Sequence, residues 1–511
     1  MKFNHLAAAA AAALLLVAMP AAAQKAKDTL RLAINDPFPI LSPHYYQVDE
    51  AGNFHRGIIQ TLLAYDEHKQ KLVPQLGKSW TRISPTVIEV ELFENLTFHN
   101  GDKFDADDVV DTMNFAKDPK YQFEIKTRHT WVKSVEKLGP YKVRIESEQV
   151  NAMDFGLLAY RAAILDSKVL NPLEDKSEYG KTAVGTGPYR LVSLDKNAGV
   201  VIERYEGFKG DPAYNRAPIK RIMGIPMPDK QTQVANLMAG NIDMLRNVTP
   251  ETADELAKSG KFDVSIPPTA SFVFAIIDAA GRAGNKALTD VRVRKAMWMA
   301  VDRDKIIKYI VPGGQQGVAQ KMNALCFDFA IGCRYSKALP PYDPAEAKRL
   351  LAEAGYPNGF DLTYDVFIPM KAIGEAIAGD LLKVGIRTTV VPMPFTLYRK
   401  KQANNELQMV SLWSPTSGHP DVGNTLDLFF NEPRDYARDP EMNKLMEAGL
   451  GELDPEKRAQ IYEKALNLNN EQLYVWPFSS MPIVFVHTKD IEIKDNLLSA
   501  GDTNVTDYFW K

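Results

Sequence analysis

The length that remains after residues 1–23 is the feature that most constrains the fold of this chain. These first residues are expected to be removed, which leaves 488 of the 511 residues. A single hydrophobic core stops growing at about 250–300 residues, and longer chains divide into separate units. We therefore expect two or more lobes, with a cleft where they meet.

Residues 1–23 have the pattern of a secretory signal peptide. Lys2 gives a basic start, residues 6–19 form an apolar run, and an Ala-x-Ala site ends at Ala23. A membrane anchor is the alternative, but an apolar run of about 14 residues is shorter than the roughly 20 needed to span a bilayer. No cysteine lies near the cleavage site, so we expect a periplasmic mature protein without a lipid anchor.

The charge balance does not indicate a nucleic-acid or membrane partner. The 61 basic side chains nearly cancel the 64 acidic ones. No later apolar stretch reaches the roughly 18 residues of a membrane helix. We expect a monomer that binds no nucleic acid.

Cys326 and Cys333 are the only cysteines in the sequence. Because the signal peptide directs them to an oxidising compartment, we predict a disulfide between them. Two free thiols or half of a metal site are the alternatives, but there is no second cysteine pair, and no histidine lies between or beside the two.

Hydrophobic patterning predicts a mixed α/β fold. Apolar and polar residues alternate at 30–34, 88–92 and 143–146, which predicts strands, the first with one buried face. Apolar residues at helical spacing predict one packed amphipathic helix over 291–310. Three helix starts combine a capping residue with a following proline, at Thr249-Pro250, Asp343-Pro344 and Asp454-Pro455.

The sequence carries no recognisable catalytic pattern. It contains no His-Glu-x-x-His, Cys-x-x-Cys, Gly-x-Ser-x-Gly or Gly-x-x-x-x-Gly-Lys-Ser/Thr motif. Ser134 and Lys137 match Ser-x-x-Lys without the motifs that accompany it in hydrolases, and the glycine-rich stretch 185–189 contains a proline. The eight histidines lack metal-ligand spacing. We predict no catalytic residue, no metal and no cofactor.

A series of motifs, taken in order, resembles the family of extracytoplasmic solute-binding proteins of ABC importers that bind peptides, nickel chelates and opines (family 5). The most specific motif is Tyr-Asp-Pro-x-x-Ala-Lys-x-Leu-Leu-x-x-Ala-Gly-Tyr at 342–356. The resemblance covers nearly all of the mature chain. The other motifs lie at 57–66, 73–80, 98–102, 106–109, 184–189, 239–243 and 290–303.

The resemblance implies a two-lobed periplasmic-binding-protein fold, class II-like, whose lobes are joined by two hinge strands. Lobe I would comprise 24–45, 182–276 and 480–511, with an accessory subdomain at 46–181, and lobe II would comprise 277–479. The implied partners are an inner-membrane permease and its cytoplasmic ATPases.

The resemblance also implies where a ligand binds. In peptide-binding relatives an Asp three residues after a tryptophan holds the peptide's amino terminus, whereas Thr416 follows Trp413 here. A hydroxyl cannot form the charge-assisted pair that a carboxylate forms with an ammonium group, so a simple peptide ligand is in doubt. The further candidate contacts are Ser417, His419, Asp421, Lys371, Tyr45, Tyr46, Phe272 and Phe274.

Two of these groups have other possible roles. Lys371 could meet an anionic group of the ligand or be a solvated surface lysine. The aromatic candidates Tyr45, Tyr46, Phe272 and Phe274 could line the cleft or pack in the core.

The expected function is capture of a peptide-like or other small organic solute in the interlobe cleft and its delivery to the permease, without turnover. Nickel-type relatives keep the tryptophan without the aspartate, so a metal chelate or anionic organic ligand is the first alternative. An opine or oligosaccharide is the next. A periplasmic enzyme and a sensory or chaperone protein are alternatives of a different class.

Overall fold

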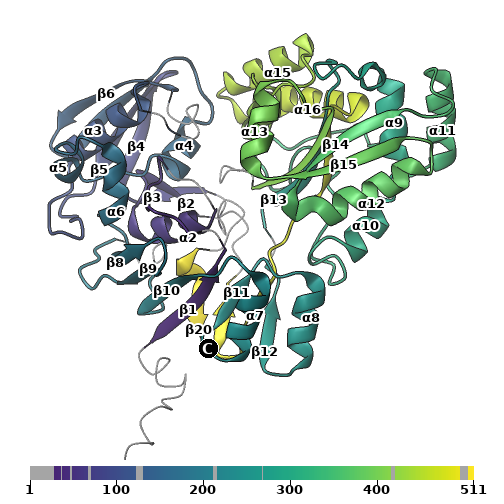
Figure 1. The fold of residues 1–511 in the computed structure, drawn as a ribbon. Helices are drawn as coiled ribbons and strands as arrows, with labels where there is room; N and C mark the ends of the chain where they lie inside the picture. Colours follow the sequence, from purple (N-terminus) through teal and green to yellow (C-terminus); the bar gives the residue numbers. More distant parts are fainter. Residues whose placement is uncertain are drawn as a thin grey trace, which may run out of the picture.

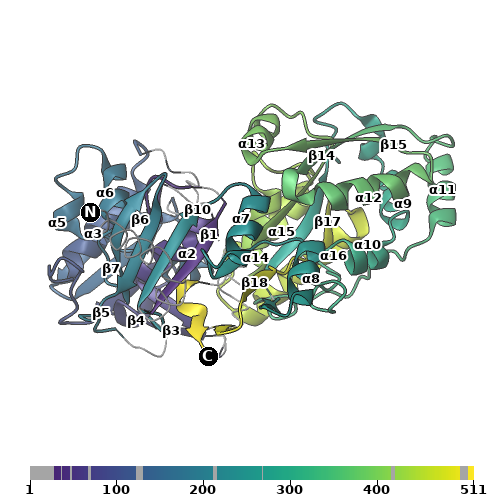
Figure 2. The same ribbon diagram turned by 60° about the horizontal axis from the view of Figure 1, so that its bottom comes forward.

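The computed structural model describes residues 28–511 except 36, 46–48, 67–68, 70, 122, 124–129, 211–215, 268, 416–420 and 495–503. The expected signal peptide lies outside the described residues. So do four candidate ligand contacts, Tyr46, Thr416, Ser417 and His419. In Figure 1, lobe II stands at the upper right, the accessory part of lobe I at the upper left, and the main sheet of lobe I below them. The turned view of Figure 2 also shows lobe II and the accessory part on opposite sides of the molecule.

Lobe I is built on a seven-stranded sheet with the strand order β12-β18-β11-β1-β10-β9-β8. The central strand β1 pairs in parallel with β10 and β11. The strands are β1 (Thr29–Ile34), β8 (Tyr189–Asp195), β9 (Gly199–Arg204), β10 (Arg221–Pro226), β11 (Met244–Arg246), β12 (Phe262–Ser265) and β18 (Phe485–Thr488), with helices α2 (Asp49–Ile58), α7 (Lys230–Met238) and α8 (Pro250–Lys258) and the C-terminal elements β19 (Ile491–Ile493), η5 (Val505–Asp507) and β20 (Tyr508–Trp510).

Strand β1 is buried on both faces, so the prediction of one buried face was wrong. Leu32 packs into a cluster shared with α2, while Ala33 packs into a second cluster shared with α7 and α8. Arg31 is buried because its guanidinium pairs with Asp243, with an N–O distance of 2.8 Å. The arginine made the sequence of β1 alternate as in a half-exposed strand, although both faces of the strand are covered.

The accessory part carries a four-stranded antiparallel sheet with the order β4-β5-β7-β6. Ile88, Val90, Val143 and Ile145 are buried together beneath helix α3, as their alternation predicted. The elements are β2 (Leu63–Asp66), β3 (Lys71–Pro74), β4 (Gly77–Ser84), β5 (Val87–Leu92), α3 (Ala106–Lys117), β6 (Val132–Gly139), β7 (Lys142–Ser147), α4 (Asp154–Tyr160), α5 (Ser167–Leu170), η2 (Lys176–Glu178) and α6 (Tyr179–Thr182).

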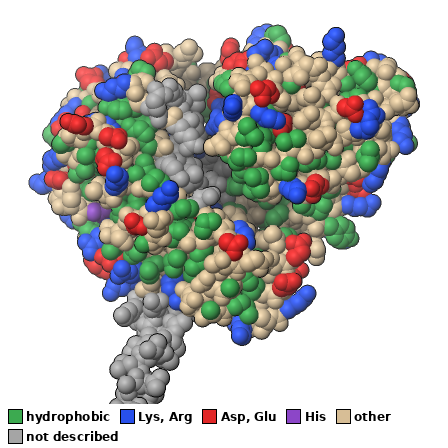
Figure 3. Space-filling view, in the orientation of Figure 1, with side chains coloured by type: hydrophobic (Ala, Val, Ile, Leu, Met, Phe, Trp, Pro, Cys, Tyr) green, Lys and Arg blue, Asp and Glu red, His purple; other side chains and the backbone are tan. Residues whose placement is uncertain are grey.

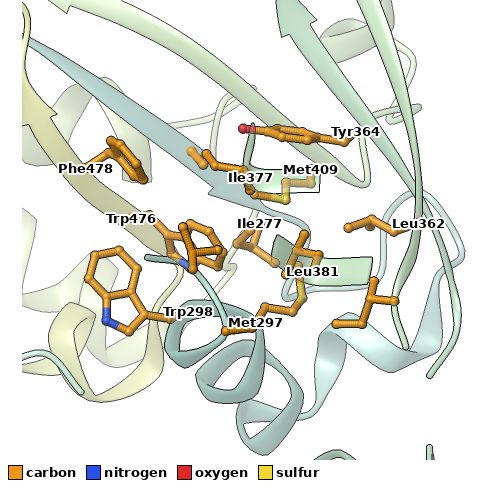
Figure 4. Packing of buried hydrophobic residues seen from close by; sticks show 14 of the residues in the cluster. Ile277, Met297, Trp298, Leu362, Tyr364, Ile377, Leu381, Met409, Trp476 and Phe478 are labelled. Atoms are coloured by element: carbon orange, nitrogen blue, oxygen red, sulfur yellow. The ribbon is translucent and has the colours of Figure 1, made fainter. Parts of the chain in front are cut away.

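Lobe II is built on a five-stranded sheet with the order β15-β14-β16-β13-β17. Its core contains Trp298 and Trp476, which pack edge to face with ring centroids 5.3 Å apart (Figure 4). The elements are β13 (Ser271–Ile277), η3 (Lys286–Thr289), α9 (Val291–Met299), α10 (Arg303–Tyr309), α11 (Pro344–Glu353), β14 (Asp361–Phe367), η4 (Ile368–Met370), α12 (Lys371–Leu382), β15 (Arg387–Met393), α13 (Phe395–Ala403), β16 (Met409–Pro415), α14 (Val422–Phe430), α15 (Pro440–Leu450), α16 (Pro455–Gln472) and β17 (Val475–Ser480).

The chain crosses between the lobes at two places, after β12 and after β17. Strand β13 pairs with β16 and β17, so lobe II begins near residue 271, earlier than the boundary of 276 and 277 that we expected. Helix α2 also differs from expectation. It packs in the core of lobe I, although its residues fall within the range expected for the accessory subdomain.

The helix starts that combine a cap with a proline are all present. Thr249, Asp343 and Asp454 accept hydrogen bonds from the first turns of α8, α11 and α16. The single helix expected over 291–310 is instead two helices, because Asp302 caps a new helix, α10, by accepting from the Lys305 main-chain N–H. None of the helices in the described ranges is long and apolar enough to cross a membrane.

Candidate ligand-binding cleft

A cavity of about 1460 Å³ lies between the lobes. Lobe I, the accessory part and lobe II each supply part of its wall, and residues 481–484 line it where the chain crosses back. Hydrophobic side chains gather on the margin of lobe II that faces the other lobe (Figure 3). The cavity is larger than the roughly 300–1,000 Å³ of most small-molecule pockets, which leaves space that closure of the lobes could remove.

On the lobe I side, polar groups hold one another in place. Asn35 follows β1, and its main-chain and side-chain N–H groups donate to Glu50 Oε1 at 3.0 and 2.5 Å. Gln233 Nε2 donates to Asn35 Oδ1 at 2.8 Å, and the Lys230 ammonium group donates to the same oxygen. This network joins β1, α2 and α7 at the carboxyl edge of the sheet, where open α/β sheets bind their ligands.

The accessory part touches lobe II directly at one edge of the cavity. The Ala152 main-chain N–H donates to the Leu450 carbonyl at 2.8 Å, and Arg458 Nη1 donates to the Ala152 carbonyl at 3.3 Å. Arg458 is buried and also pairs with Asp421 at 3.2 Å. Direct hydrogen bonds between the accessory part and lobe II therefore border the cleft at this edge. The accessory residues that line the cavity are Thr130, Trp131, Glu148, Gln149, Val150, Asn151, Met153, Leu157 and Arg161.

The lobe II wall is mostly apolar and aromatic. Its side chains come from the sheet strands β13, β14 and β16 and from helices α13 and α14, so a rigid scaffold positions them. An apolar wall of this kind can bury the body of an organic ligand, while a few polar groups fix its orientation. The apolar and aromatic lining residues from these elements are Phe274, Phe367, Phe395, Tyr398, Leu412, Trp413 and Leu428, and Tyr309, Ile310, Pro312, Pro369, Ala372, Ile373 and Leu450 add to the wall from other parts of lobe II.

Two arginines add positive charge to this apolar wall. Arg399 of α13 lies over the Phe395 ring, 5.0 Å from its centroid, and Arg434 follows α14. Within the described residues neither guanidinium forms an ion pair or a hydrogen bond. Burial lowers the pKa of Arg434; the Asp427 carboxylate opposes this, and the charge of Arg399 adds to it. The two guanidinium groups are thus near enough to repel each other.

Trp413 is the ligand candidate from the sequence that lines the cavity together with Phe274. Phe272, by contrast, is 1% exposed and packs with Phe327 and Phe429 in the core of lobe II. The two phenylalanines share one face of β13, because they are two residues apart on the strand, and their ring centroids lie 5.7 Å apart. Phe274 is also largely buried and packs on Phe429, but of the two only Phe274 reaches the cavity wall.

The remaining described candidates lie off the cavity wall. Asp421 is buried and caps α14 by accepting from the Gly423 main-chain N–H at 2.8 Å. Lys371 begins α12 and lies 3.6 Å from Glu375 on an exposed surface. Tyr45 packs against Phe123, with centroids 5.0 Å apart. For these three residues the structure supports roles in capping, surface charge and packing.

Sequence reasoning did not identify Arg399 and Arg434. They are separated along the chain, and each follows or lies within a helix that carries no motif. Their common signal is position, since α13 and α14 precede and follow β16, the strand that contains Trp413, along the chain. Only the fold brings these elements to one wall.

Cys326 and Cys333 are joined by a disulfide, with their Cα atoms 5.8 Å apart. The loop that they close contacts the start of α14, where the Val422 main-chain N–H donates to the Ile331 carbonyl at 3.1 Å. The disulfide thus supports a helix of the cleft wall. In the described ranges, no group of three or more His, Cys, Asp or Glu side chains could hold a metal ion.

Comparison with known proteins agrees with this architecture. Heme-binding protein A of Haemophilus influenzae is 26% identical over 454 residues, which cover 80% of this chain and 79% of the relative. NikZ of Campylobacter jejuni, solved in complex with Ni(L-His), matches with a TM-score of 0.80 at 20% identity, over 94% of this chain and 99% of that one.

A dipeptide-binding protein of Pseudoalteromonas sp. SM9913, solved with Met-Leu, matches with a TM-score of 0.79 at 18% identity, over 94% of this chain and all of that one. At these identities the structural matches establish the shared fold. The family model of bacterial extracellular solute-binding proteins, family 5, matches residues 71–437, which is most of the chain. The chain is therefore a member of the family 5 bacterial extracellular solute-binding proteins.

Proposed function

We propose that this protein captures a peptide-like or other small organic solute in the interlobe cleft and delivers it to the permease of an ABC importer. The observation that carries the proposal is the 1460 Å³ cavity, whose walls come from both lobes. A ligand that contacts both walls binds the closed state more tightly than the open state. That difference in affinity shifts the protein toward closure.

The proposal includes several features of the mature protein. It would be a periplasmic monomer, released by cleavage after Ala23 and without a lipid anchor, and its partners would be the inner-membrane permease and cytoplasmic ATPases. Its lobes would move about the segments near 265–271 and 480–485. Trp413 would contact the ligand, with Thr416, Ser417 and His419 in the segment that follows.

A second candidate ligand class is favoured by Arg399 and Arg434. Two guanidinium groups that have no acceptor among the described residues favour an anionic organic solute or a metal chelate with free carboxylates over a neutral oligosaccharide. The ligands of the relatives also differ in chemistry, since one relative is named for heme and one was solved with Ni(L-His). Membership of the family therefore leaves the ligand to be found by experiment.

A thermal-shift screen of residues 24–511 tests the proposal. The panel would hold di- and tripeptides, nickel-histidine, hemin, opines and oligosaccharides. A ligand that binds only the folded state at 100 times its Kd stabilises that state by about 2.7 kcal/mol, so one class should raise the Tm selectively. If no class raises the Tm, and no small molecule is released when the purified protein is denatured, capture of these solutes is contradicted.

Recovery of the ligand separates capture from catalysis. A binding protein returns the ligand chemically intact after prolonged incubation, which mass spectrometry would show. Conversion of the ligand at a rate proportional to protein concentration would instead indicate a periplasmic enzyme. A sensory or chaperone role would be indicated if the ligand-bound protein failed to stimulate ATP hydrolysis by the reconstituted importer.

A further inference from the structure

We propose that Arg399 and Arg434 form an anion subsite on the lobe II wall, which binds the carboxylate of an organic ligand whose apolar body lies against the neighbouring aromatic side chains. The inference rests on the proposed function and names the ligand class. Both residues line the cavity. They belong to different elements, because Arg399 lies in α13 and Arg434 follows α14.

Arg399 and Arg434 are half-buried, and they differ in their partners from the fully buried arginines of this protein. Arg31 pairs with Asp243 at 2.8 Å, and Arg458 pairs with Asp421 at 3.2 Å. Arg294 is buried too, and its Nε donates to the Gln472 carbonyl at 2.7 Å. Buried charges are paired or hydrogen-bonded as a rule. In the part of the chain that the structure describes, Arg399 and Arg434 have no such acceptor.

The charge of Arg399 also acts on Arg434. Burial and the nearby charge of Arg399 both disfavour the charged form of Arg434. A fold under no functional constraint gains nothing from two like charges held together on an apolar wall. A carboxylate bound between them would relieve the repulsion, because guanidinium groups bind carboxylates through charge-assisted and often bidentate hydrogen bonds.

The charges of Arg399, Arg434 and Asp427 do not cancel. Asp427 is the carboxylate that acts on Arg434, and its Oδ1 already accepts from Asn431 Nδ2 at 2.8 Å. Two arginines and one aspartate leave one net positive charge at the subsite. A single carboxylate matches that charge, whereas a free ammonium group would be repelled.

The surface beside the two arginines is apolar and aromatic. Phe395 lies beneath the Arg399 guanidinium group, and Tyr398, Leu412 and Trp413 line the same wall. The Tyr398 hydroxyl accepts from Gln402 Nε2 at 2.6 Å, so this hydroxyl already has a partner within α13. Aromatic and aliphatic groups of this kind bury an apolar ligand body next to the charged group.

The test uses 3-phenylpropionate as the probe and 3-phenylpropionamide as its neutral match, each titrated by thermal shift and by ligand-observed NMR. The acid should bind the wild-type protein at least tenfold more tightly than the amide. The Arg399→Met and Arg434→Met variants should each remove most of this preference, while their Tm without ligand stays unchanged or rises. Arg349→Met is the matched control, because Arg349 is exposed on α11 and pairs with Glu346.

Each result decides the question. Equal binding of acid and amide, no binding of either, or a preference that both variants retain would overturn the subsite. A preference that Arg349→Met also removes would overturn it as well, because the effect would then reflect general charge. If the acid is preferred but no larger solute binds in the screen, the proposed capture fails and the subsite stands. If a larger solute binds equally well to wild type and both variants, the subsite fails and capture stands.

Discussion

The polar groups on the two walls of the cleft differ in whether they have hydrogen-bond partners within the protein. On lobe I, Asn35, Glu50 and Lys230 are joined in one hydrogen-bonded network at the end of β1. On lobe II, Arg399 and Arg434 face the cavity among aromatic side chains without a partner in the described residues. The lobe I wall is preformed, whereas the lobe II wall is completed by what binds to it. Binding proteins gain specificity from such unsatisfied groups and lose some stability through them.

The largest expected effect is on stability, and it concerns the buried ion pair between Arg31 and Asp243 in lobe I. Asp243→Asn would leave Arg31 buried without its carboxylate, so the free energy of unfolding should fall by about 3–5 kcal/mol. Urea unfolding at pH 7 would measure this change. Asp263→Asn is the control, because Asp263 pairs with Lys511 at 2.9 Å on the surface and should matter by about 0–1 kcal/mol. Equal effects of the two variants would remove the contrast between buried and exposed pairs.

The second effect is a loss of stability in acid, which we expect in lobe I and its accessory part. Burial lowers the pKa of His99 from 6.5 to about 4, against the opposing effect of its bond to the Gly187 carbonyl. Burial lowers the pKa of His44 to about 4 as well. Between pH 4 and pH 6.5 the unfolded chain therefore binds more protons than the folded chain. The contribution of these neutral histidines to the free energy of unfolding is complete above pH 6.5 and is lost as the pH falls toward 4.

Urea unfolding at pH 7.5 and pH 5 would measure this acid sensitivity. We expect a loss of about 1–2 kcal/mol for each buried histidine. His99→Gln should reduce the loss, because Gln does not titrate. Hydrogen exchange should place the early opening in lobe I and not in lobe II, whose described residues include no histidine. A larger loss in lobe II would contradict this distribution.

The third effect tests the apolar part of the lobe II wall. Trp413→Ala should weaken binding of the ligand found in the screen by about tenfold or more, because buried aromatic side chains carry much of the energy of an interface. Isothermal titration would measure the affinity. Tyr342→Ala is the control, since Tyr342 is exposed on lobe II and does not line the cavity. Wild-type affinity in the Trp413 variant would remove this residue from the site.

The smallest effect is expected for Lys371, which lies beside the cavity wall and not on it. Lys371 adjoins the cavity-lining residue Ala372, but it is exposed and lies near Glu375. Lys371→Met should therefore change the affinity by less than about twofold, as is usual for an exposed charge whose partner is also exposed. A tenfold loss of affinity would show that Lys371 reaches the ligand when the lobes close.

Local features of the fold could be predicted from the sequence, whereas features set by distant pairing could not. Asp343 and Asp454 mark helix starts because capping depends on neighbouring residues alone. Strand β13 was assigned to the wrong lobe because its partners, β16 and β17, lie far along the chain. The burial of Arg31 could not be predicted, because its buried partner Asp243 is 212 residues away.

The same distinction holds within the candidate site. Trp413 could be named because a family motif surrounds it, and the structure places it on the cavity wall. Arg399 and Arg434 belong to no such motif, and their importance comes from being close together without a carboxylate partner. That property depends on the packing of α13 and α14 around the sheet and cannot be seen in either segment alone.

The central claim is that a solute bound between the two walls closes the lobes. Small-angle X-ray scattering of residues 24–511, with and without the ligand that raises the Tm, tests it most directly. The account predicts a smaller radius of gyration with ligand, and no such decrease in the Arg399→Met, Arg434→Met double variant at the same ligand concentration. An unchanged radius of gyration in a wild-type sample saturated with ligand would contradict the account.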